Sequence, residues 1–324
     1  MTDVNLGQML STTLKKYRPT LTDNIQESNA IFYALKEKGA IKIEDGGERI
    51  VEPLMFGLND TAGSYDGYDQ LDVTPQEGID AAEFNWKQYS VSITISGKQI
   101  RQNKGRKEKI IDILDAKTQQ AEISLKASLT DGIFSDGTGN DSKDLTGLQA
   151  MVLASGTYGG IDSGTYSWWQ ANMDSDAVAL SLADMRGVFN DCTIGGKDGP
   201  DLIVTTSDGY EAYEAFFTQL GTTNVYGSFN TPSEGMKKMA DGGFSNLGFK
   251  GVPIVWDESC PDGAMYFLNT KHMKLVVHED ANFDTTDFEK PEDQDALVAQ
   301  ILFMGNLTCN RRNSFGALTA KTDL

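Results

Sequence analysis

Apolar residues recur at helical spacing between 97 and 134, which predicts the longest helix of the chain. They step by three or four residues, with Lys117 as the polar member of the series. The resulting stripe consists of Ile110, Leu114, Lys117, Ala121, Leu125 and Leu129. A shorter helix is expected from Asp23, which can cap its first turn, to Gly39, which can end it. Two more are expected to begin at Ser181 and near Asp208, each followed three positions later by an acidic residue.

Alternating apolar and polar positions predict strands over 49–56 and 84–95. In the second strand the apolar parity switches between Trp86 and Tyr89, so a bulge or bend is expected near 87–88. The Gly- and Asp-rich segment 57–78 predicts a long loop between the two strands. Because an isolated two-stranded ribbon is marginal in water, this projection is expected to rest on a neighbouring copy in a homo-oligomer.

The second half of the chain predicts a compact mixture of strands and helices. Short apolar runs indicate strands at 201–206, 252–256, 264–268 and 274–277. The segment 296–318 predicts a β-hairpin, with Gly305 and Asn306 as a candidate turn or bulge.

Charge changes this picture, because it is strongly acidic and segregated. The 324 residues contain 47 Asp and Glu against 28 Lys and Arg, a net charge of −19. This balance argues against a protein that wraps nucleic acid electrostatically, and against binding to anionic membranes. Segment 44–86 has eleven acidic residues and one arginine, whereas 97–130 has eight basic and four acidic residues. Segment 278–295 is acidic again.

Motifs for catalysis, metals or cofactors are not found. The two histidines, His272 and His278, have no partners at ligand spacing, and the three cysteines are scattered, as buried free thiols are. Phosphate-binding, dinucleotide-binding and nucleophile-elbow motifs are absent from the sequence, so no cofactor and no enzyme activity are expected. Oxygen-bearing side chains alternate over 136–144, as in an EF-hand loop. The two diagnostic positions, Asp141 and Gly147, do not fit, and an ordinary acidic turn is favoured over a calcium site.

The N-terminus lacks the basic start and apolar run of a signal peptide, and no stretch is apolar enough to span a membrane. We therefore expect synthesis in a reducing cytoplasm.

The order of elements and six phrases resemble the major capsid protein of tailed bacteriophages. The phrases lie at 131–134, 147–151 with 158–162, at the tryptophans Trp168 and Trp169, and at 201–213, 266–272 and 305–312. The resemblance implies an α+β protein with the tailed-phage major capsid fold (Johnson fold), which has an N-terminal arm, an extended loop and a long spine helix. It also implies the following parts: N-terminal arm 1–44, extended loop 45–90, peripheral domain 91–178 with spine helix 97–134, axial domain 179–282, and a return to the peripheral domain over 283–324.

The function implied by this resemblance is structural. Copies would assemble as pentamers and hexamers into an icosahedral shell that encloses double-stranded DNA without sequence-specific binding, in a virion made in the bacterial host cytoplasm. Because the arm begins almost at Met1, a separate scaffolding protein is expected. A portal protein is expected too, with a decoration or cement protein as a further candidate. No membrane partner is expected.

Charge complementarity predicts the contacting surfaces of this shell. An acidic loop laid over a neighbour's basic helix would fix register and orientation more than affinity. The loop residues are Asp60, Asp66, Asp69, Asp72 and Glu77; the helix residues are Arg101, Lys104, Arg106 and Lys107. The alternative is that both clusters are solvated faces.

Two rival functions remain at this stage. An encapsulin, a bacterial compartment shell of the same fold, would enclose cargo enzymes instead of DNA. An acidic soluble enzyme with unrecognised carboxylates would form small oligomers with turnover, which negative-stain microscopy separates from shells.

The absence of lysine from the extended loop predicts a shell without covalent cross-links from that loop. Some members of the capsid family join subunits by a Lys–Asn isopeptide bond from the extended loop, but this chain has no lysine between Lys42 and Lys87. Assembled shells boiled in detergent are therefore expected to run as monomer on a gel. A ladder of larger bands would contradict this prediction.

Overall fold

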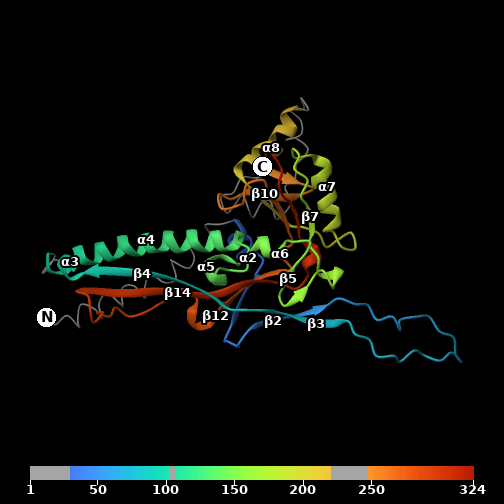
Figure 1. Ribbon diagram of the computed structural model, residues 1–324, viewed down its shortest axis with the longest axis horizontal. Coiled ribbons are helices and arrows are strands. Elements are labelled where there is room, and N and C mark those ends of the chain that lie inside the picture. The colour runs from blue at the N-terminus through green and yellow to red at the C-terminus, as the bar shows by residue number, and fades with distance from the viewer. Residues whose placement is uncertain (1–29, 103–106, 220–246) are drawn as a thin grey trace.

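The computed structural model describes residues 30–102, 107–219 and 247–324. It has three parts: a long body, an upright part and a thin arm (Figure 1). The body contains β4 (Lys87–Ser96), β14 (Ala296–Cys309), α3 (Gly97–Gln102) and α4 (Lys107–Phe134). The arm is formed by β2 (Ile50–Met55) and β3 (Ile79–Phe84).

The body is built on β14, a strand of 14 residues. One edge of β14 pairs with β4 over its first ten residues, and the other edge pairs with β13 (Asp284–Thr285) and β12 (Met273–His278). β1 (Ile41–Glu44) adds a parallel strand outside β12. The predicted stripe of α4 is buried as expected at Leu114, Ala121, Leu125 and Leu129. Thr118, rather than Lys117, completes it, because its hydroxyl donates to the carbonyl of Leu114 at 2.8 Å. The side chain of Ile110 lies outside the described part.

The upright part holds a second, six-stranded sheet. Its strand order is β7 (Asn172–Asp174), β15 (Gly316–Leu318), β11 (Met265–Leu268), β8 (Leu202–Thr205), β10 (Val252–Trp256) and β9 (Leu247–Phe249). α7 (Leu182–Asp191) and α8 (Ser207–Gln219) accompany this sheet. The capping box at Ser181 is confirmed, since its side chain accepts the N–H of Asp184 at 3.1 Å. The predicted strands at 201–206, 252–256, 264–268 and 274–277 are confirmed within one or two residues.

The hairpin predicted over 296–318 is wrong. β14 runs through Gly305 and Asn306 without turning, and β15 joins the other sheet. Gly305 lies between two paired strands, where a Cβ would come within 2.5 Å of the Val276 carbonyl oxygen. The Asn306 side chain is fully buried and bonds to the carbonyl of Asn85 and the N–H of Thr146. Both residues are therefore selected by close packing inside a strand. The prediction failed because glycine followed by asparagine is also a common sequence signal for a turn.

The N-terminal elements differ from expectation in detail. The first helix, α2 (Ala30–Glu37), ends before Gly39 at φ +65°, as predicted, whereas the expected cap Asp23 lies outside the described residues. The second predicted strand is two strands, β3 and β4, separated at Asn85 and Trp86, just before the expected bend. No described helix is long and apolar enough to cross a membrane.

A buried arginine connects the short elements between the sheets. Arg312 opens η3 (Arg312–Ser314) and is 1% exposed. Its guanidinium donates to the carbonyls of Met151 at 2.7 Å, Ala150 at 3.0 Å and Trp169 at 3.4 Å. Two of these carbonyls belong to the last residues of α6 (Leu148–Met151), whose ends lack helical partners. The charge is thus buried against backbone oxygens.

Replacing this arginine by lysine is expected to destabilise the fold. Arg312→Lys keeps the charge but cannot reach three carbonyls in a planar fork, so the free energy of unfolding should fall by about 2–4 kcal/mol in denaturant titrations. Arg186→Lys, at an exposed position of α7, is the matched control and should change it by under about 0.5 kcal/mol. Equal effects of the two substitutions would contradict this role.

Candidate assembly surfaces

The base of the arm is packed firmly on the body. On β2 Ile50 and Leu54 point inward, and on β3 Ala82 and Phe84 do the same. Ala82 and Phe84 rest on a small hairpin of β5 (Thr157–Tyr158) and β6 (Ile161–Asp162). The Phe84 ring meets the Tyr158 ring edge-on, with centroids 5.0 Å apart.

The turn of that hairpin explains the close fit. Gly159 has φ +60°, and a Cβ there would lie 2.8 Å from the Cβ of Ala82. The carbonyl of Gly159 accepts the N–H of Glu83 at 2.9 Å. The glycine therefore permits both the left-handed turn and the approach of the arm.

Two further contacts stabilise the arm where it leaves the body. Phe56 stacks on Trp168, with centroids 4.6 Å and planes 10° apart. Arg49 pairs with Glu83 at 2.6 Å across the two strands. At the outer end of the two strands, the N–H groups of Phe56 and Gly57 both donate to the carbonyl of Gly78. The residues between Gly57 and Gly78 form the loop.

The predicted acidic residues all lie exposed on this loop, which we call the arm tip (residues 57–78). Their hydrogen bonds organise the loop itself: Asp66 and Asp69 bond through their backbone and side-chain atoms, and Asp72 accepts from Thr74. Hydrogen bonds from the hydroxyl and N–H of Thr74 lower the pKa of Asp72. These hydrogen bonds stabilise the charged form of Asp72, whose side chain is exposed on the loop.

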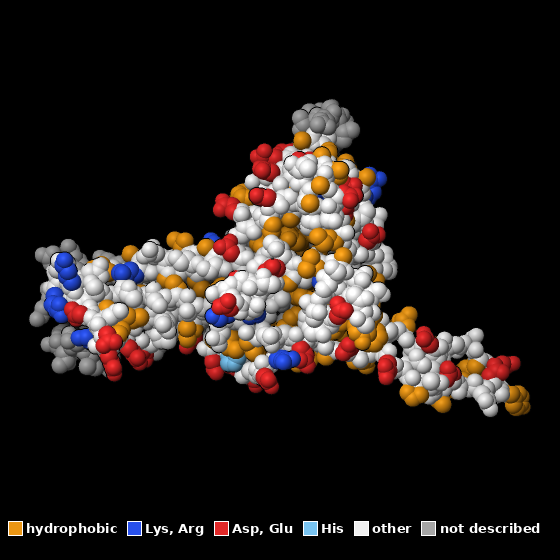
Figure 2. All heavy atoms as spheres, viewed as in Figure 1, with side chains coloured by type: hydrophobic (Ala, Val, Ile, Leu, Met, Phe, Trp, Pro, Cys, Tyr) orange, Lys and Arg blue, Asp and Glu red, His pale blue; other side chains and the backbone are white. Residues whose placement is uncertain are grey.

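The arm also carries large apolar side chains in water, which the charge pattern did not predict. Leu58 is 92% exposed, Val73 88% and Met55 85%. Figure 2 shows these hydrophobic groups interspersed with acidic ones along the arm. The full set is Val51, Met55, Phe56, Leu58, Tyr65, Tyr68, Leu71, Val73 and Ile79. A concentration of this kind makes the arm a candidate interaction surface. The sequence signal for this surface is the set of large apolar residues within a segment that is otherwise polar.

Two of the predicted basic positions, in α3 and at the start of α4, lie at the other end of the body. Arg101 is in α3 and pairs with Asp295 of its own chain at 2.7 Å, with both side chains at least half exposed. Lys104 and Arg106 lie outside the described residues. Lys107 begins α4, and its side chain lies outside the described part. The structure therefore does not bring the arm tip and the basic segment together within one chain (Figure 1).

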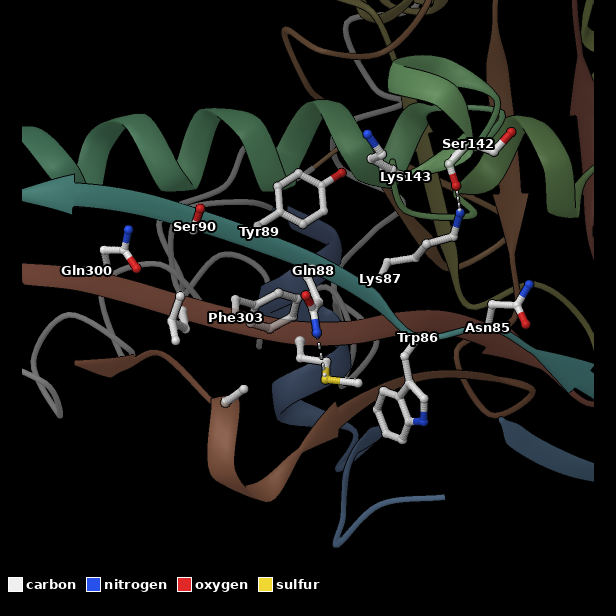
Figure 3. A pocket seen from close by; sticks show the side chains of 13 residues that line it. Asn85, Trp86, Lys87, Gln88, Tyr89, Ser90, Ser142, Lys143, Gln300 and Phe303 are labelled. Carbon is white, nitrogen blue, oxygen red and sulfur yellow. Dashed lines mark hydrogen bonds between the residues drawn. The ribbon is translucent and has the colours of Figure 1, made fainter. Parts of the chain in front are cut away.

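A pocket of about 540 Å³ lies at the bend between the arm and β4. The Lys87 ammonium reaches across it to the carbonyl of Ser142 (Figure 3). Burial lowers the pKa of Lys87, and the charge of Asp144 opposes this shift. Gln88 and Tyr89 also line the pocket, where the Tyr89 hydroxyl accepts the N–H of Leu145 at 3.0 Å.

The turn beside this pocket contains the alternating oxygens noted in the sequence. Asp136 accepts from the N–H and hydroxyl of Thr138, which lowers the pKa of Asp136. Asn140, Asp141 and Ser142 all have positive φ. In the described residues no group of three or more His, Cys, Asp or Glu is arranged to hold a metal ion. The cation that this turn does contact is Lys87.

Comparison with known proteins identifies the class of this molecule. The sequence matches the family model described as SU10 major capsid protein over residues 86–322. The chain belongs to this family. A search of curated proteins found no match.

Solved capsid structures share the fold. The chain is similar to the cyanophage A-1(L) capsid subunit, with a TM-score of 0.64 and 17% identity over 87% of this chain and 90% of that one. It is also similar to the satellite phage P4 procapsid (TM-score 0.52, 11% identity, 94% and 90% covered) and to the capsid of Myoviridae phage XM1 (0.52, 10%, 88% and 91%).

The α+β capsid fold expected from the sequence is thus confirmed, as is the structural role. The protein is a phage major capsid protein, a structural protein that forms the icosahedral shell of the virion, and not an enzyme.

The packing at the base of the arm predicts a sharp contrast between a buried and an exposed position of the β2–β3 ribbon. Phe84→Ala removes a buried ring against Tyr158, so the free energy of unfolding of the unassembled chain should fall by about 3–5 kcal/mol. Met55→Ala, at an exposed position of the same ribbon, should leave it within about 0.5 kcal/mol. Denaturant titration measures both. A comparable loss of stability for Met55→Ala would contradict the exposure of the Met55 side chain in the unassembled subunit.

Proposed function

We propose that copies of this chain form pentamers and hexamers in which the arm of one subunit lies over the next. The observation that carries the proposal is the exposed apolar arm tip. Within the part of the chain that the structure describes, Leu58, Tyr68 and Val73 stay exposed to water, and a second copy would supply a surface that covers them.

Energetic magnitudes favour apolar contact over charge as the main source of affinity. Full burial of one large apolar side chain contributes about 1.5–3 kcal/mol, whereas an exposed ion pair contributes about 0–1 kcal/mol. We infer that the apolar residues of the arm tip hold the neighbour and that Asp60, Asp66, Asp69, Asp72 and Glu77 set register.

The basic partner of these acids is proposed to be the start of the spine helix in the neighbouring subunit. The two charged regions lie at opposite ends of one chain, which suits contacts between copies arranged in a ring. Arg101 can exchange its exposed pair with Asp295 for an arm carboxylate at little energetic cost. Lys104, Arg106 and Lys107 are proposed to contribute in the same way.

The remaining features are proposed from the resemblance and the charge. The shell would enclose double-stranded DNA, and a net charge of −19 suits a container that does not grip it. A scaffolding protein, a portal protein and a decoration or cement protein are the proposed partners. Residues 179–282 are proposed as the axial domain. The upper sheet draws on 172–174 and 316–318 as well as on strands inside that range.

The apolar contribution is tested by a double substitution in the arm tip. Leu58→Ser with Val73→Ser should leave the unfolding of the isolated chain unchanged. It should raise the subunit concentration needed for half-assembly by about 100-fold or more, the loss expected for two buried aliphatic side chains. Assembly is followed by light scattering and sedimentation. Ile123→Ser, at an exposed position of α4, is the control. Normal assembly of the double variant would overturn the proposal.

The charge contribution is tested separately. Asp60→Asn with Asp66→Asn should slow assembly at low salt by a factor of several, and added salt should reduce the difference from wild type. The final yield of shells should change less than in the apolar variant. A salt-independent defect would assign these carboxylates a role inside the loop instead.

A further inference from the structure

The arm joins the body through two short connectors that lie outside the strands. Residues 45–49 lead from β1 to β2 and contain Gly46 and Gly47, whose φ angles are +137° and +123°. Asn85 and Trp86 separate β3 from β4 at the bend in Figure 3. The indole N–H of Trp86 donates to the carbonyl of Gly47 at 2.9 Å, so the two connectors lie side by side. Because short segments outside paired strands absorb changes in φ and ψ, the two connectors together form a hinge for the arm.

A buried ion pair spans this hinge. Glu52 lies on β2 between the buried residues Ile50 and Leu54, and only 2% of its own side chain is exposed. One carboxylate oxygen accepts from the ammonium of Lys274 on β12 at 2.8 Å, and the other accepts from the hydroxyl of Thr308 on β14 at 3.5 Å. Lys274 and Thr308 are directly opposite each other on these paired strands. Glu52 therefore connects the arm to two strands of the body sheet at once.

Stability alone does not explain a charged pair at this position. Burying two ions costs their hydration, and apolar residues of similar volume often give equal or greater stability. Ile50 and Leu54 are buried on the same face of β2, so the arm accepts apolar groups at this depth. The ion pair contributes direction, because it holds two groups within hydrogen-bond distance, whereas apolar surfaces can slide past one another.

The other contacts at the base of the arm attach it to a different support. Ala82, Glu83 and Phe84 of β3 meet the β5–β6 hairpin, and Phe56 stacks on Trp168. Among the side-chain hydrogen bonds and ion pairs of the described residues, those of Glu52 connect β2 to the body sheet. Two supports on different elements define the angle of a ribbon more closely than one support does.

We propose that the Glu52–Lys274 ion pair is a brace that fixes the angle at which the arm leaves the body, across the hinge formed by residues 45–49 and 85–86. With the brace in place, the arm of the unassembled subunit points in one direction. The consequence for assembly rests on the proposed function: a braced arm loses less entropy when its tip meets a neighbouring copy.

The test measures the direction of the arm in the unassembled full-length chain by pulsed electron paramagnetic resonance. Spin labels are placed at Asp80→Cys on β3 and Ser124→Cys on α4, because both positions are exposed and the three native cysteines are buried. The chain with an intact brace should give one narrow distribution of distances. Glu52→Leu with Lys274→Met removes both charges, and it should widen this distribution about twofold or more. The unfolding equilibrium constant of this double variant should stay within about tenfold of wild type.

Two further variants serve as controls. Arg49→Gln with Glu83→Gln removes the exposed ion pair that joins the two strands of the same ribbon, and it should leave the distance distribution unchanged. Lys274→Met alone leaves a buried carboxylate without its cation, so the unfolding equilibrium constant should rise about 100-fold or more. A rise of only severalfold would contradict the burial of a charged Glu52.

An unchanged distance distribution in the Glu52→Leu, Lys274→Met variant would overturn the brace. Failure of this variant to fold would overturn it too, because the pair would then be a requirement for folding. Assembly of the same variant is followed separately by light scattering. A widened distribution together with unchanged assembly would support the brace and contradict the proposed role of the arm, so the two failures are distinguishable.

Discussion

An apolar ribbon cannot remain stable in water without a surface to lie on, and the design of this subunit follows from that constraint. The arm is rigidly based, through Phe84 on Tyr158 and Phe56 on Trp168, yet its tip exposes Leu58 and Val73. A firm base limits the entropy lost when the tip binds a second copy. The body supplies a stiff support, because β14 continues unbroken beneath α4.

Charge has a different role from apolar contact in this account. The net charge of −19 favours soluble subunits and, under the proposed function, would weaken contact with enclosed DNA. Its segregation along the sequence makes segment 44–86 acidic and segment 97–130 basic. Individual exposed pairs contribute little energy, so their value lies in selecting the register in which apolar groups meet.

Features that depend on neighbours in the sequence were predictable. The α4 stripe, the Ser181 cap and β8 follow from local periodicity and local hydrogen bonds, and the structure confirms them. The prediction of a hairpin at Gly305 was wrong because this position is a glycine for close packing against a strand about thirty positions away in sequence. The contact between His272 and Asp198 could not be predicted from the sequence either, since the two residues lie 74 positions apart. Of the candidate site, the acidic arm tip was predicted, whereas its apolar residues were overlooked because acids dominate the composition.

The central claim is that the arm tip binds a neighbouring subunit mainly through its apolar side chains. A cryo-electron microscopy reconstruction of the assembled shell tests it most directly, by the exposed fractions of Leu58, Tyr68 and Val73. The account predicts that all three are buried against another copy, with the acidic side chains at the rim of that contact. An arm that projects into solvent, or contacts its neighbour through carboxylates alone, would contradict it.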